Sequence, residues 1–132
     1  MGTIKRFEDL EIWKNARELC KEIYLLREKL MVENDFKLYN QINGSSGSIM
    51  DNIAEGFERN GNKEFCQFLS VAKASCGETR SQLYRVLDRN YINKEEFFNI
   101  ENKLISLSKQ ISGFITYLKK SELKGSKFNK QP

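Results

Sequence analysis

The chain has no histidine among its 132 residues. Di-iron sites in helical bundles take a histidine from each of two helices, and serine and cysteine hydrolases use a histidine base, so both classes are excluded in their usual forms. Two Ser-x-x-Lys matches, Ser70 with Lys73 and Ser106 with Lys109, lack the other motifs of the enzymes that use this pair. We therefore expect no enzyme activity, no cofactor, no metal and no small-molecule substrate.

The chain also lacks an internal proline, long apolar runs and paired cysteines. The single proline is the last residue, Pro132, so nothing forces a helix to break. No run of about 18 apolar residues could span a membrane, and the charged first ten residues do not resemble a signal peptide. The three cysteines contain no Cys-x-x-Cys pair, which is typical of buried thiols in the cytosol. We expect a cytoplasmic protein that makes no membrane contact.

The net charge of +4 is unevenly distributed. Residues 1–118 contain equal numbers of acidic and basic side chains, so the basic excess begins at Lys119 and Lys120 and continues to the end. A protein that binds nucleic acid over its whole surface would have a more uniform excess. This distribution predicts that any nucleic-acid contact is weak.

Apolar residues recur at spacings of three and four in four segments, which is the period of an amphipathic α-helix. The first segment covers residues 9–31, with Asp9 as its N-cap and Phe7 packed back on the first turn. The second begins at Asn34 and Asp35 and keeps its phase through the small residues 43–48. Each glycine in a helix interior costs about 0.5–1 kcal/mol, and we interpret this run as letting a neighbouring backbone approach closely.

The other two helices have clear starts. A turn at residues 56–62 precedes the third, which Asn62 is expected to cap, and Asn93 with Glu96 resembles a capping box for the fourth. Short connections make neighbouring helices antiparallel. The prediction is an all-α, up-down-up-down four-helix bundle over residues 1–120, followed by a flexible Lys-rich tail at 121–132.

Two sets of side chains are candidates for contacts with other molecules. The first set comprises basic residues of the third helix, which lie on both sides of its core stripe, and of the C-terminal end; they are either a solvated flank or a phosphate-contacting surface. Its members are Lys73, Arg80, Arg85, Arg89, Lys119, Lys120 and Lys124. The second set combines polar residues late in the second helix with apolar residues away from the core stripes, and is either ordinary surface or a contact between subunits. Its members are Asn52, Glu55, Arg59, Leu25, Tyr84, Phe98 and Tyr117.

Several short motifs resemble one known family. They are Phe7-Glu8-Asp9-Leu10-Glu11-Ile12-Trp13, Gln41-Ile42, Asn52-Ile53-Ala54-Glu55-Gly56 and Lys63-Glu64-Phe65. Over residues 7–118 the chain resembles the bacterial four-helix-bundle proteins encoded in intervening sequences of 23S rRNA genes, a family that includes the accessory variability protein of diversity-generating retroelements. The resemblance implies a barrel-like homopentamer, which in the retroelement relatives binds reverse transcriptase and RNA through a basic outer surface. Family members often carry basic residues where this chain has Asn43 and Gly44.

Two functional hypotheses follow. The first is a homo-oligomeric, pentameric scaffold that weakly binds RNA or a nucleic-acid enzyme such as a reverse transcriptase. The second is a protein-interaction module whose exposed aromatic side chains dock a partner without nucleic-acid binding.

Overall fold

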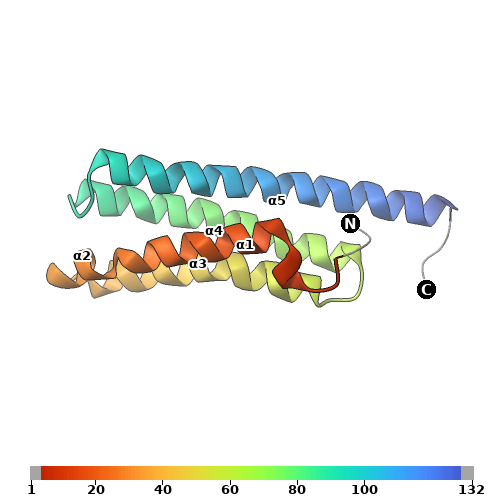
Figure 1. Cartoon of the computed structure of the whole chain (residues 1–132), viewed down its shortest axis with the longest axis horizontal. Coiled ribbons are helices and arrows are strands. Elements are labelled where there is room, and N and C mark those ends of the chain that lie inside the picture. Colours follow the sequence, from red (N-terminus) through yellow and green to blue (C-terminus); the bar gives the residue numbers. More distant parts are fainter. Residues whose placement is uncertain (1–3, 129–132) are drawn as a thin grey trace.

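The protein is a bundle of antiparallel helices, shown by a computed structural model that describes the backbone of residues 4–128 and the side chains of residues 4–121. Its elements are a short 3-10 helix η1 (Phe7–Asp9) and the helices α1 (Glu11–Leu25), α2 (Arg27–Val32), α3 (Phe36–Phe57), α4 (Asn62–Asp88) and α5 (Lys94–Phe128). Helices α1 and α2 together form the first of four arms, and no strand occurs in the part described (Figure 1). The predicted all-α four-helix bundle is confirmed.

The four arms form a closed ring of neighbours. Helix α4 packs against α3 and α5, and α1 packs against α3 and α5 on the other side. The groove between α4 and α5 is therefore on the side of the bundle opposite the groove between α1 and α3 (Figure 1). Apolar side chains from all four arms fill the centre.

The first arm differs from its prediction. The chain breaks at Leu26, whose N–H donates to the Ile23 carbonyl in a tighter turn and whose side chain is buried, while Leu25 is 72% exposed. The expected N-cap at Asp9 is wrong, because Asp9 belongs to η1 and α1 begins after Leu10 without a side-chain cap. The packing of Phe7 on the first turn is confirmed by its edge-on contact with Trp13, with ring centroids 5.1 Å apart.

Helix α3 runs unbroken through the small residues, as predicted, but for a different reason. Gly44 and Gly47 face open space, because a Cβ added at either position would meet nothing within 4 Å, so they do not bring a neighbouring backbone close. Ser45, one of the two serines between them, faces α4 instead. Its hydroxyl is 2.8 Å from Thr79 Oγ1 and donates a hydrogen bond to Gln82 Oε1, and all three residues are buried. The small segment therefore forms a buried polar contact between α3 and α4.

Two of the predicted helix starts are confirmed. The Asp35 carboxylate accepts a hydrogen bond from the Leu38 N–H at the start of α3. Asn93 and Glu96 form a reciprocal capping box at the start of α5, with distances of 3.0 Å and 2.8 Å.

The turn between α3 and α4 differs from the prediction at both of its ends. Gly56 is buried within α3, where an added Cβ would be 2.7 Å from Phe68 Cβ, so this is the glycine that allows two helices to approach closely. Gly61, with φ of +99°, is the N-cap position of α4. Asn62 is not a cap; its side chain donates to the Leu118 carbonyl of α5.

Helix α5 continues beyond the other helices (Figure 1). Its backbone is helical to Phe128, past the predicted bundle boundary at Lys120, while residues 129–132 lie outside the described part. The division into a bundle and a flexible tail stays a prediction. No helix of the described chain has the length and apolar character needed to cross a membrane.

Candidate functional site

The outer groove between α4 and α5 is flanked by two stretches that contain no acidic residue. Residues 65–77 of α4 and residues 102–121 of α5 lack both Asp and Glu. The Cys66 thiol points at the Ile115 carbonyl across the two antiparallel helices, at 3.9 Å. This register places the two stretches side by side, so their basic side chains are not neutralised by carboxylates of the facing helix.

Four lysines of α4 and α5, which we call the lysine track, lie in this groove or beside it. Lys63 and Lys119 line the same shallow hollow of about 250 Å³ at one end. The antiparallel register brings Lys73 opposite residue 108, about three turns further along. Lys109 follows that residue and lines a hollow formed by α5 residues alone. All four are exposed, and none forms an ion pair with a described side chain. Sequence reasoning missed Lys63 and Lys109, although the acid-free stretch that contains Lys109 is visible in the sequence.

Aromatic side chains occupy the other end of the groove. Tyr84 and Phe98 are 45% and 52% exposed, and both contact the buried ring of Phe97, with centroids 4.7 Å and 5.4 Å away. The Tyr84 hydroxyl donates to Glu101 Oε2 at 2.9 Å, and this hydrogen bond raises the pKa of the phenol. The carboxylate therefore holds the Tyr84 ring in one orientation.

Arg80 lies between the aromatic end and the lysine track. Its Nη2 is 3.7 Å from Glu101 Oε2, and its Nε is buried without a hydrogen-bond partner among the described atoms. Arg80 thus balances the charge of the nearly buried Glu101, and the groove as a whole remains basic. Of the predicted basic contacts, Lys73, Arg80 and Lys119 are brought together here.

Arg85 is half-buried in the last turn of α4, and Arg89, just after α4, lies at the start of α3. Arg89 Nη1 is 2.6 Å from Asp35 Oδ2, and the Tyr91 hydroxyl donates to the same oxygen at 2.7 Å. The hydrogen bonds from Tyr91 and Arg89 lower the pKa of the Asp35 carboxyl. Arg89 therefore joins the ends of α3 and α4 and is not part of the groove.

The remaining basic candidates are near the end of α5. Lys120 is exposed, and the side chain of Lys124 lies outside the described residues. Both follow Lys119 along the helix, so they extend the same positive region in sequence.

Two of the three polar partner-contact candidates, which lie late in α3 and just after it, make contacts within the chain. Asn52 donates to Ser48 on its own helix, at 2.8 Å and 2.9 Å. Arg59 pairs with Glu64 at 2.9 Å and lies over the Phe68 ring, and Glu55 is exposed. Their role in contacts between subunits stays a prediction.

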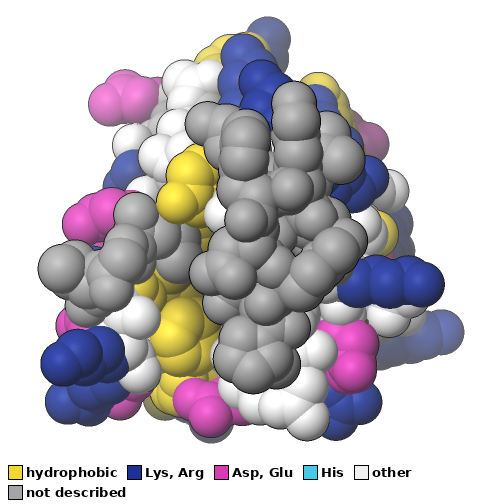
Figure 2. Space-filling model, turned by 90° about the vertical axis from the view of Figure 1, so that its right-hand side faces the viewer, with side chains coloured by type: hydrophobic (Ala, Val, Ile, Leu, Met, Phe, Trp, Pro, Cys, Tyr) yellow, Lys and Arg dark blue, Asp and Glu magenta, His cyan; other side chains and the backbone are white. Residues whose placement is uncertain are grey.

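Tyr117 is separate from Tyr84 and Phe98. It stacks on Phe114 near the start of the chain, where both line an apolar hollow of about 460 Å³ with Leu10. The end-on view of Figure 2 shows hydrophobic side chains open at this end of the bundle. The aromatic residues predicted as one class of contact therefore belong to two surfaces.

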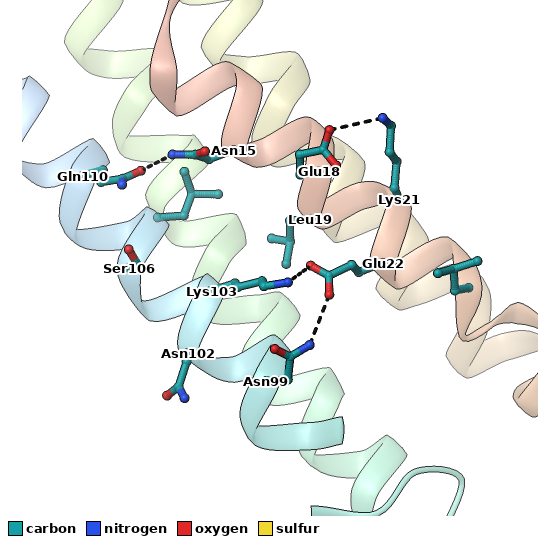
Figure 3. Close-up of a pocket in the computed structure, with 12 residues that line it drawn as sticks. Asn15, Glu18, Leu19, Lys21, Glu22, Asn99, Asn102, Lys103, Ser106 and Gln110 are labelled. Carbon is teal, nitrogen blue, oxygen red and sulfur yellow. Dashed lines mark hydrogen bonds and ion pairs between the residues drawn. The ribbon is translucent and has the colours of Figure 1, made fainter. Parts of the chain in front are cut away.

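A hollow of about 810 Å³ lies between α1 and α5 and is lined mainly by polar side chains, several of which bind one another (Figure 3). Glu22 accepts from Lys103 at 2.7 Å and from Asn99 at 3.3 Å, and Asn15 donates to Gln110 at 2.8 Å. These pairs join the two helices. In the described part of the chain, no three Cys, Asp or Glu side chains are arranged to hold a metal ion.

Comparison with known proteins agrees with this architecture. Residues 8–113 match the family model described as 23S rRNA-intervening sequence protein. The fold is similar to the crystal structure of a protein of unknown function from the S23 ribosomal protein family of Bacteroides thetaiotaomicron, with a TM-score of 0.75 and 25% identity over 79% of this chain and 97% of that one. No curated protein matches the chain. Because the family model covers most of the chain, this protein belongs to the 23S rRNA-intervening sequence protein family.

Proposed function

We propose that the protein is a non-enzymatic, homo-oligomeric scaffold in the cytoplasm that binds nucleic acid through the lysine track. The observation that carries this proposal is the pairing of two acid-free stretches across one groove. Lys73, Lys109 and Lys119 lie in these stretches and Lys63 lies just before the first, and none of the four pairs with a carboxylate among the described side chains. Lysine side chains of this kind contact phosphates and release condensed counterions. A partner that itself works on nucleic acid, such as a reverse transcriptase, could share the same RNA.

The oligomeric part of the proposal is supported by apolar surface on the opposite side. Tyr24 and Leu25 are 57% and 72% exposed and, with Met50, line a hollow of about 540 Å³ between α1 and α3. Exposed apolar surface concentrated on one face of a small protein is typical of subunit contacts. The resemblance to the retroelement proteins favours five subunits.

The same apolar surface favours a second candidate function. A protein-interaction module would use this side for a different protein and would leave the lysine track unused. The two candidates differ in one measurable property, because only the first predicts salt-sensitive binding of nucleic acid.

The test compares two double variants that each remove two positive charges. K73Q/K109Q alters the lysine track, whereas K14Q/K21Q alters lysines of α1 that pair with Glu11 and Glu18. Fluorescence anisotropy with a labelled RNA hairpin at salt concentrations from about 50 to 200 mM should show affinity falling with salt for the wild type and the α1 control. K73Q/K109Q should bind more weakly, with the log–log slope reduced by about 1.4–1.8 for two lost phosphate contacts.

Two outcomes would contradict the proposal. Wild-type binding that does not weaken with salt would refute the phosphate contacts, and equal effects of the two double variants would refute the location. Sedimentation velocity at several concentrations tests assembly, and a single subunit at high concentration would refute the scaffold.

A further inference from the structure

We infer that the groove between α4 and α5 is a binding site for single-stranded nucleic acid, in which bases stack on Tyr84 and Phe98 while the lysine track contacts the phosphates. This inference rests on the proposed function and names its ligand class. It differs from a purely electrostatic surface, because duplexes hide the faces of their bases.

The arrangement of the groove carries the inference. Two half-exposed rings lie at one end of the groove, and the lysine track follows on the same two helices toward the other end. None of its four lysines pairs with a carboxylate in the part of the chain whose side chains are described. Residues 63–84 of α4 span about 30 Å at 1.5 Å per residue. That length suits the site sizes of roughly 4–16 nucleotides that single-strand binders use, and combining aromatic platforms with a cationic groove is how such proteins bind without sequence preference.

The Tyr84 ring is prepared for stacking. Its hydroxyl is fixed by Glu101, one side of the ring packs on Phe97, and 45% of the residue stays exposed. An aromatic ring already held in place loses little conformational freedom when a base stacks on it. Phe98, more exposed still, extends the platform by one ring on α5.

Charge distinguishes a nucleic-acid strand from a protein segment as the occupant. A purely apolar protein contact would not require unpaired lysines along the rest of the groove. The Glu101 carboxylate is nearly buried and accepts a hydrogen bond from Tyr84 with Arg80 close by, so it adds little repulsion for phosphates.

The test uses the full-length protein and two labelled probes of equal length, an oligo(A) RNA of about 12 nucleotides and an RNA duplex of about 12 base pairs, at low salt. The wild type should bind the single strand at least about tenfold more tightly. Y84L should weaken single-strand binding by about 5- to 100-fold and leave duplex binding nearly unchanged. A 2-aminopurine placed in the single strand should change its emission when it stacks on the wild-type protein, and should change much less with Y84L.

Two matched variants separate stacking from folding. F36L removes an aromatic residue of similar exposure, 51%, at the start of α3 and should bind both probes like the wild type. Y84F keeps the ring but loses the hydrogen bond to Glu101, and should retain affinity within about threefold. The deoxy form of the oligo(A) probe should bind similarly, because stacking and phosphate contacts do not use the 2′-hydroxyl.

The results that overturn the inference differ from those that overturn the proposed function. Equal affinity for duplex and single strand, or an unchanged affinity for Y84L together with a loss for K73Q/K109Q, would refute stacking and leave phosphate binding intact. A change in the sedimentation of Y84L without a change in nucleic-acid binding would make the aromatic end a protein contact, and would also refute the inference. No binding of either probe would refute the proposed function itself.

Discussion

Because α3 and α4 approach closely at Gly56, replacing this glycine by alanine should destabilise the protein, although the same substitution inside a helix usually stabilises it. Replacing glycine by alanine inside a helix normally stabilises it by about 0.5–1 kcal/mol. In G56A the new Cβ would be 2.7 Å from Phe68 Cβ and 2.9 Å from Phe65 Cδ1. Phe68 Cβ is bonded directly to the α4 backbone and cannot rotate away, so the two helices must separate.

The expected magnitude follows from these two opposing effects. Overpacking a closely packed contact costs about 1–3 kcal/mol, which exceeds the gain in helix propensity. The free energy of unfolding of G56A should therefore fall by about 0.5–2 kcal/mol. Urea unfolding followed by circular dichroism would show the change as a lower midpoint with an unchanged slope.

The matched control is the same substitution on the same helix at Gly44. An added Cβ there meets nothing within 4 Å, so G44A should raise stability by about 0.5–1 kcal/mol. Both variants must be compared at one protein concentration, because oligomerisation would couple to stability. If G56A were as stable as the wild type, or G44A lost as much stability as G56A, the argument from Cβ contacts would be wrong.

Two further predictions concern ionisable groups. D35N removes the charge that accepts hydrogen bonds from Arg89 and Tyr91, and should cost about 1–3 kcal/mol at neutral pH. Because the pKa of Asp35 is lower in the folded state, its contribution is present above the unfolded value of about 4 and is lost as the pH falls through the folded value. The difference between wild type and D35N in urea unfolding should therefore shrink as the pH falls from about 7 to about 3, and a constant difference would contradict the pairing. Burial raises the pKa of the Cys76 thiol to about 12, so at a pH of about 8 an alkylating reagent should label it only as fast as the protein opens. Mass spectrometry of the labelled peptide tests this, and rapid labelling of the native protein would refute it.

The parts of the fold that the sequence predicts correctly depend on interactions within one helix. The apolar period identifies all four arms because the buried stripe of each arm is what the core is made of. The capping box of Asn93 and Glu96 is equally local, since its two hydrogen bonds join residues three apart. The continuity of α3 is predictable for the same reason, because the period of its apolar residues does not change.

The errors arise where a residue's role is set by a distant segment. Asn62 is a residue type that often caps helices, but its side chain donates a hydrogen bond to the carbonyl of Leu118, 56 residues away. Gly56 is a residue type that often occurs in turns, but here it lies within α3, where the close approach of α4 leaves no room for a Cβ. The break at Leu26 depends on which of two adjacent leucines the core accepts. The pattern of residues in one sequence does not show which of these long-range contacts forms or which leucine is buried.

The sequence also does not show which basic residues are paired with carboxylates, and this pairing decides which of them are available to bind phosphate. A helical wheel places Arg89 on one side of its own helix, but only the tertiary structure shows that Asp35 neutralises it. The balance of charge over residues 1–118 is equally misleading, because a sum over the chain hides where the acids are absent. An unpaired cation becomes predictable when both the helix that carries it and the helix beside it lack acids over the facing turns. Lys73 and Lys109 meet that condition, so the proposed phosphate contact depends on the antiparallel register of α4 and α5 more than on the net charge of +4.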